Sequence, residues 1–137
     1  MPDFDQQNRL IVDQLCRALD GVIAVYRFGS TAVGTASRSS DTDIAVLART
    51  RLLPEVRFDV QEQLAARLGS DVDLVDLATA APVMAIQVVA LGEILFDGDS
   101  AARGQFEDRM FGAYARLNEE RRGILERIAA EGTVYGR

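Results

Sequence analysis

The chain of 137 residues contains no histidine and a single cysteine, Cys16. The lack of histidine excludes Ser-His-Asp and Cys-His nucleophile systems, histidine acid–base catalysis and His-ligated zinc. One cysteine excludes a disulfide framework and a cysteine-cluster metal site. The apolar residues around Cys16 predict that it is buried in a helix. Any catalysis by this chain must therefore depend on carboxylates, a metal ion and a bound nucleotide.

Long hydrophobic runs and an excess of positive charge are also missing. No apolar run approaches the roughly 20 residues that a membrane helix needs, so no membrane contact is expected. The acidic, polar N-terminal segment is unlike a secretory signal, and we expect a cytoplasmic protein. The net charge of −6 argues against direct binding of nucleic acid, whose phosphates attract basic surfaces. A small-molecule site or a basic protein partner is compatible with this charge.

The hydrophobic patterns predict an α/β (α+β) fold, with a mixed β-sheet flanked by helices, in a single domain over residues 1–137. Hydrophobic residues make up 48% of the chain and charged residues 26%, which is typical of a folded globular domain. A helical extension is expected at about 100–131. The other predicted helices are 4–19, 31–36, 54–68 and 83–91, and the predicted strands are 22–28, 41–47, 71–77 and 93–96.

Residues 28–47 contain the pattern that points to chemistry. The apolar strand 22–28 ends at Gly29-Ser30, ten residues follow, and Asp41-Thr42-Asp43 then opens the next strand. Alternation along a strand places Asp41 and Asp43 on one face, where their charges repel unless a cation such as Mg²⁺ neutralises them. A Gly-Ser turn before a helical turn offers backbone N–H groups and a hydroxyl to a phosphate. These parts suffice for metal-assisted nucleotidyl transfer.

This pattern resembles the signature of the DNA polymerase β-like nucleotidyltransferases. Chain length and the later segments make it most similar to the minimal nucleotidyltransferases (MNT), the antitoxin partners of HEPN toxins. The resemblance covers about residues 20–97, which it identifies as the catalytic core, and implies that Gly29 and Ser30 bind the nucleotide. Relatives often carry a basic residue where this chain has Val33. A contact to the triphosphate is therefore missing or comes from Arg38.

The resemblance also implies a third carboxylate on a neighbouring strand, which completes the metal site and accepts the proton of the attacking hydroxyl. Three residues of the segment 71–77 are candidates. Asp73, in Val-Asp-Leu-Val, matches the family position best, while Asp71 and Asp76 remain alternatives. Asp71 and Asp73 share one strand face and Asp76 points to the other. Asp41, Asp43 and Asp73 are thus the predicted catalytic residues and ligands of Mg²⁺.

The activity that the resemblance implies is transfer of AMP from ATP to a tyrosine hydroxyl of a cognate HEPN ribonuclease toxin, which is thereby neutralised. Two alternatives stay open: neutralisation by binding alone, and nucleotidyl transfer to a small molecule of the aminoglycoside type. Phe106, Met110, Tyr114 and Leu117 recur at helical spacing in the C-terminal extension. This stripe is predicted either to pack on the core or to bind the toxin.

Overall fold

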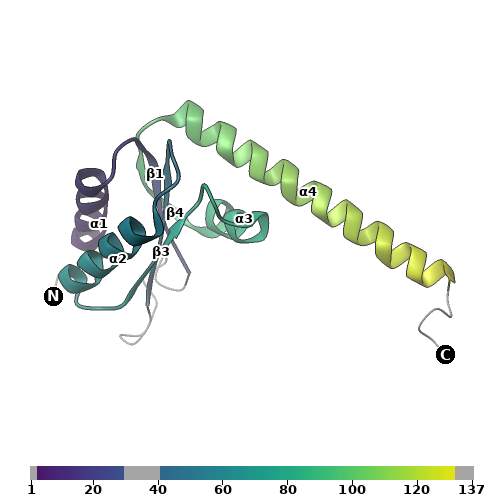
Figure 1. Cartoon of the computed structure of the whole chain (residues 1–137), viewed down its shortest axis with the longest axis horizontal. Helices are drawn as coiled ribbons and strands as arrows, with labels where there is room; N and C mark the ends of the chain where they lie inside the picture. The colour runs from purple at the N-terminus through teal and green to yellow at the C-terminus, as the bar shows by residue number, and fades with distance from the viewer. Residues whose placement is uncertain (1–2, 30–40, 132–137) are drawn as a thin grey trace.

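The computed structural model describes residues 3–29 and 41–131, and its four strands form one mixed sheet in the order β3-β2-β1-β4 (Figure 1). β1 (Val22–Phe28) pairs antiparallel with both β2 (Thr42–Ala48) and β4 (Glu93–Asp97). β2 pairs parallel with β3 (Val72–Asp76). The predicted mixed-sheet fold is confirmed, and the predicted helix at 31–36 lies outside the described residues.

Each helix begins where a local signal in the sequence predicts it. α1 (Phe4–Ala18) opens with a capping box, in which the Asp3 carboxylate accepts a hydrogen bond from the Gln6 backbone N–H at 2.8 Å. α2 (Pro54–Leu68) and α3 (Pro82–Leu91) begin with proline, whose missing N–H costs nothing in a first helical turn. α2 ends at Gly69 in the left-handed region.

The sheet is covered on both faces, which explains why its central strands are nearly continuous apolar runs. α1 and α2 lie on one face and α3 and the start of α4 (Ser100–Glu131) on the other (Figure 1). The buried cluster under α1 and α2 contains Ile11, Leu15, Leu19, Val25, Ile44, Val46, Val60, Leu64, Leu68, Val72 and Leu74. The cluster under α3 and α4 contains Ile23, Ala24, Tyr26, Ala45, Leu47, Leu77, Ala85, Val88 and Phe106.

A polar network fixes the beginning of α4 to the sheet. The fully buried Tyr26 of β1 donates a hydrogen bond from its hydroxyl to Oε2 of Glu107 at 2.8 Å. The same carboxylate oxygen pairs with Nη1 of Arg103 at 2.9 Å, and Nε of Arg103 lies 3.1 Å from Oδ2 of Asp97. Burial and the Glu107 carboxylate together raise the pKa of Tyr26, so its hydroxyl stays protonated and able to donate.

We expect Tyr26→Phe to lower the free energy of unfolding by about 2 kcal/mol, because the hydroxyl donates to a charged acceptor. Urea denaturation at neutral pH would measure the change. Tyr114→Phe is the matched control, since no hydrogen bond of the Tyr114 hydroxyl is found within residues 3–29 and 41–131. If the two substitutions lowered the free energy of unfolding equally, the Tyr26–Glu107 hydrogen bond would contribute nothing to stability.

The two halves of α4 differ in their surroundings. Phe106 is 3% exposed and Met110 packs beside it, so this part of the predicted stripe belongs to the core. Further along, Leu117 is 41% exposed and Leu125 is 59% exposed. Figure 1 shows this distal part of α4 extending away from the sheet. Of the two alternatives for the stripe, core packing is therefore confirmed for its first half, and partner binding stays a prediction for the exposed second half.

The prediction for Cys16 was wrong. Cys16 lies in α1, as expected, but its side chain is exposed. The buried positions of this helix are Ile11 and Leu15, which are spaced four residues apart and face α2 and the sheet. Cys16 follows Leu15 directly and so is turned away from that face.

Candidate active site

Three strand ends meet at one edge of the sheet and bring the predicted site residues together. In the antiparallel pair of β1 and β2, Phe28 lies opposite Asp43, so Gly29 follows next to the start of β2. In the parallel pair of β2 and β3, Asp43 lies opposite Asp73. Residues directly opposite on neighbouring strands point to the same face. The Asp43 and Asp73 carboxylates are therefore neighbours, on the face that α3 and α4 cover.

Gly29 lies close to the Asp43 carboxylate. Its φ of +76° lies in the left-handed region, which side chains with a Cβ rarely adopt. A Cβ built on Gly29 would collide with Oδ2 of Asp43. The resemblance implied that Gly29 binds the nucleotide, but nothing in the sequence indicated that Gly29 lies against Asp43. Ser30, the other predicted nucleotide-binding residue, lies outside the described residues.

The electrostatics of Asp43 show that negative charge is concentrated at this edge. Partial burial raises the pKa of Asp43, and the charges of Asp73 and Asp41 raise it further. Asp41 directly precedes β2 and is exposed. The other two predicted carboxylates thus both act on Asp43 through space.

The three candidates for the third carboxylate have different surroundings. Asp73 is exposed beside Asp43, as described above. Asp71 precedes β3, and its carbonyl oxygen accepts a hydrogen bond from the Thr42 N–H at 2.9 Å. Asp76 is buried on the opposite face of the sheet, where its carboxylate accepts hydrogen bonds from the backbone N–H groups of Leu52 at 2.8 Å and Ala78 at 3.0 Å. Asp76 therefore supports two loops, and its place in the fold separates it from the Asp43 carboxylate.

Arg27 also lies away from the carboxylates. It pairs with Ile44, so its side chain is on the α1 face, where its guanidinium stacks 4.3 Å from the centre of the Phe4 ring. Its Nη1 donates to Oδ1 of Asn8 at 2.7 Å. Arg27 is buried and faces neither solvent nor the carboxylate site. Arg38, the candidate for a contact to the triphosphate, lies outside the described residues.

A family model described as polymerase β nucleotidyltransferase matches residues 12–101, which include every element that forms this edge. The chain belongs to this nucleotidyltransferase family. It is 41% identical over 106 residues to protein adenylyltransferase MntA of Shewanella oneidensis, covering 77% of this chain and 76% of that protein.

Solved structures resemble this nucleotidyltransferase closely. One is a chain of a toxin–antitoxin structure with AMP-PNP, with a TM-score of 0.80, 36% identity and coverage of 89% of this chain and 98% of that one. Another belongs to a complex of the tri-AMPylated Shewanella oneidensis HEPN toxin with its MNT antitoxin, with a TM-score of 0.75 and 32% identity. That match covers 90% of this chain and 96% of the solved chain. The resemblance to minimal nucleotidyltransferases is therefore confirmed.

The carboxylate edge of this nucleotidyltransferase fits Mg²⁺ in the type of its donor groups. Carboxylate oxygens are hard ligands, and proteins often hold Mg²⁺ by one or two carboxylates together with substrate phosphates. Within residues 3–29 and 41–131, no group of three acidic, cysteine or histidine side chains is gathered closely enough to hold an ion alone. The Asp43–Asp73 pair therefore supplies part of a metal site that phosphate oxygens can complete. None of the helices described is long and apolar enough to cross a membrane.

The raised pKa of Asp43 predicts a pH-dependent cost to stability in the absence of divalent metal. A raised pKa means that the folded chain binds this proton more tightly than the unfolded chain. Stability therefore falls as the pH rises from the ordinary aspartate pKa through the raised value. Asp43→Asn removes this titration. The free energy of unfolding of the variant minus that of the unmodified chain should therefore increase with pH across that interval and then level off.

Urea unfolding of both chains in EDTA at a series of pH values measures this difference. A difference that stays constant with pH would show that the neighbouring carboxylates do not act on Asp43.

Proposed function

We propose that this nucleotidyltransferase is an antitoxin that transfers AMP from ATP to a tyrosine hydroxyl of a cognate HEPN toxin and so neutralises it. The pairing of Asp43 with Asp73 beside Gly29 at one sheet edge carries this proposal, because it provides the carboxylates and the open backbone that nucleotidyl transfer needs. The 41% identity to a protein adenylyltransferase supports a protein as the acceptor. We also infer that the reaction takes place in the cytoplasm, where ATP and an intracellular toxin are available.

In this proposal Asp41, Asp43 and Asp73 would hold Mg²⁺ together with the phosphates of ATP. An ion bound there would supply positive charge to offset the negative charge of the triphosphate and of the leaving pyrophosphate. Gly29 leaves room for the nucleotide, and Ser30 contributes a hydroxyl to a phosphate.

The tyrosine oxygen forms a bond to the α-phosphorus as the bond from that phosphorus to the β-phosphate oxygen breaks. Asp73 accepts the tyrosine proton, because it is the exposed member of the pair on the neighbouring strand. No covalent intermediate on this chain is required, which agrees with a sequence that lacks histidine.

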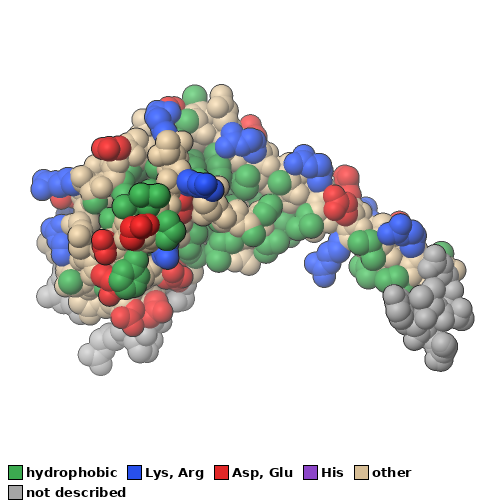
Figure 2. Space-filling view, in the orientation of Figure 1, with side chains coloured by type: hydrophobic (Ala, Val, Ile, Leu, Met, Phe, Trp, Pro, Cys, Tyr) green, Lys and Arg blue, Asp and Glu red, His purple; other side chains and the backbone are tan. Residues whose placement is uncertain are grey.

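The distal part of α4 suits the docking of the acceptor protein. Figure 2 shows hydrophobic side chains continuing from the body of the molecule along α4, beside arginines and glutamates. Leu117, Ile124 and Ile128 are exposed there although they are large and apolar. They recur at spacings of seven and four residues, which places them on one side of the helix. A partner helix could bury them, whereas a small-molecule acceptor would leave them in water.

Replacing Leu117 and Ile124 with glutamine is expected to weaken the complex with the HEPN toxin by at least about 10²-fold, since each buried apolar side chain contributes about 1.5–3 kcal/mol. Isothermal titration calorimetry with the purified toxin gives the affinity, and circular dichroism checks the fold. The matched control is Glu119→Gln with Arg122→Gln, on the same part of α4. An unchanged affinity of the Leu117 and Ile124 variant would contradict docking through this surface.

The proposed activity is tested by incubating the cognate HEPN toxin with this chain, ATP and Mg²⁺ and then measuring the intact mass of the toxin. An increase by whole AMP units is expected, together with loss of ribonuclease activity that persists after the antitoxin is removed. Asp73→Asn should prevent the increase, while Asp71→Asn, two residues earlier, should not. Neutralisation without any change in toxin mass would instead establish that the antitoxin acts by binding alone.

A further inference from the structure

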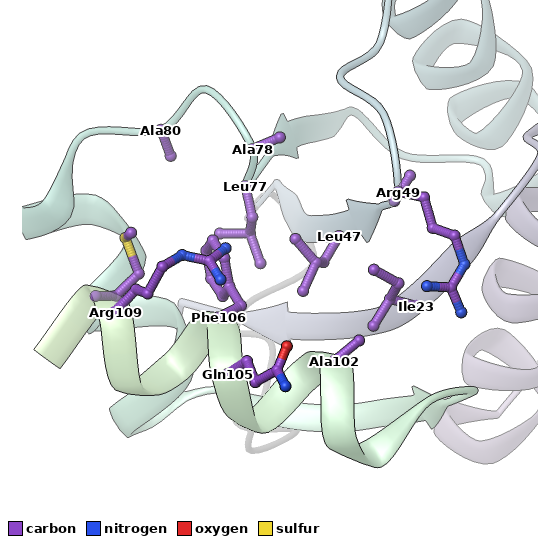
Figure 3. Close-up of a pocket in the computed structure, with 12 residues that line it drawn as sticks. Ile23, Leu47, Arg49, Leu77, Ala78, Ala80, Ala102, Gln105, Phe106 and Arg109 are labelled. Atoms are coloured by element: carbon purple, nitrogen blue, oxygen red, sulfur yellow. The ribbon is translucent and has the colours of Figure 1, made fainter.

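A pocket lies at the end of the sheet opposite to the carboxylate edge. It has a volume of about 460 Å³ and is lined from the start of β1, the end of β2, the loop after β3 and the first turns of α4. Ile23, Leu47 and Leu77 form its apolar floor and Phe106 its wall. Figure 3 shows these side chains in one row between the helix and the sheet. We call this space the α4 pocket.

The α4 pocket is locally positive in an acidic chain. Two of its lining residues are arginines, Arg49 and Arg109, and none of the described residues that line it is acidic, although Asp and Glu outnumber Lys and Arg by 21 to 15 in the chain. The two guanidinium groups stand at opposite ends of the apolar row in Figure 3.

The two arginines differ in their partners. Nη2 of Arg49 forms an ion pair with Oδ2 of Asp99 at 2.6 Å. Arg109 lies over the Phe106 ring, 5.8 Å from its centre, and forms no ion pair with a carboxylate of residues 3–29 or 41–131. Its positive charge is therefore available at one end of the apolar floor.

We propose that the α4 pocket binds a small molecule with an apolar body and one anionic group. The apolar body would lie along Leu77, Leu47 and Ile23, and the anion would pair with the Arg109 guanidinium, whose planar N–H groups match carboxylate, sulfonate or phosphate oxygens. The volume lies within the range of about 300–1,000 Å³ of small-molecule sites, which combine apolar walls with a few polar groups. This site goes beyond the proposed transfer reaction, because it lies at the other end of the sheet.

The probe is 1-anilinonaphthalene-8-sulfonate, an anion with an apolar aromatic body, and N-phenyl-1-naphthylamine is its counterpart without the sulfonate. Fluorescence titration of the full chain should show binding of the sulfonate at least about tenfold tighter than binding of the neutral compound, as a charge-assisted hydrogen bond predicts. Methyl NMR spectra recorded in the same titration should show shifts at Leu47 and Leu77 and none at Leu125, which lies on the distal part of α4.

Two substitutions and a control complete the test. Arg109→Gln should weaken binding of the sulfonate about tenfold and leave binding of the neutral compound unchanged, because it removes only the charge. Arg116→Gln, two turns further along α4, is the matched control and should change neither. Ala102→Leu should fill part of the pocket and weaken both compounds.

The proposal is overturned if methyl shifts appear only at Leu125 and Ile128, since the dye would then bind the exposed stripe. Equal affinities of the Arg109→Gln and Arg116→Gln variants for the sulfonate would overturn it as well. Neither result bears on AMP transfer, so this proposal and the proposed function can fail separately.

Discussion

Asp43→Asn is expected to lower the rate of AMP transfer by about 10³-fold, because the amide cannot replace the carboxylate as a ligand of Mg²⁺. A metal ion supplies several kcal/mol of stabilisation to the transition state of such a reaction, and each 1.36 kcal/mol corresponds to a factor of ten in rate. Pyrophosphate release in the presence of the HEPN toxin measures the rate. Asp73 and Asp41 both raise the pKa of Asp43, so Asp43 interacts with each of the other two proposed ligands. Its replacement should therefore affect the metal site more than that of Asp41 or Asp73.

The same substitution should leave the fold intact, which separates a lost ligand from a lost structure. Asparagine has nearly the same shape as aspartate and removes the repulsion from Asp73 and Asp41. Without metal, the melting temperature of the variant should therefore equal or exceed that of the unmodified chain. Asp59→Asn, an exposed residue of α2, is the control for a change of net charge elsewhere. Substantial transfer by a folded Asp43→Asn variant would remove this carboxylate from the mechanism.

Gly29→Ala is expected to abolish transfer and also to destabilise the fold. Alanine at a φ of +76° costs about 1–2 kcal/mol, and the added Cβ would push the Asp43 carboxylate from its position. Thermal denaturation and pyrophosphate release measure the two effects. The loss of activity should exceed what the backbone cost explains, because the displaced group is a metal ligand in the proposed site.

Gly69→Ala is a close control for Gly29→Ala. Gly69 has a φ of +73°, and no atom of the described part of the chain lies within 4 Å of a Cβ built on it. It ends α2 and takes no part in the carboxylate edge. Both substitutions should therefore lower the melting temperature by similar amounts, but only Gly29→Ala should stop the reaction. Equal activity of the two variants would mean that Gly29 serves only as a turn residue.

The strands and most helix ends could be predicted from the sequence, because each has a local cause. Apolar runs mark the strands, Pro54 and Pro82 start helices, and Gly69 ends one. Alternation along β3 predicted that Asp76 points to the face opposite to Asp73, and Asp76 is buried on that opposite face. These features depend on neighbours in the chain, which a sequence shows directly.

The remaining features depend on contacts between distant segments. Tyr26 and Glu107 are 81 residues apart, and nothing in either local pattern indicates their hydrogen bond. The contact of Gly29 with Asp43 follows from the register of β1 on β2, which a sequence does not give. The exposure of Cys16 depends on which side of α1 meets the sheet, and Cys16 lies off that side because it directly follows the buried Leu15.

The most direct test of AMP transfer follows the two ends of the triphosphate separately. The cognate HEPN toxin is incubated with this chain, Mg²⁺ and ATP labelled with ³²P at either the α- or the γ-position, and the proteins are then separated under denaturing conditions. We expect label from α-labelled ATP on the toxin and label from γ-labelled ATP only in pyrophosphate, with no transfer by the Asp43→Asn variant. Label from the γ-position on the toxin, or none from either position, would contradict the assignment of this chain as a protein adenylyltransferase.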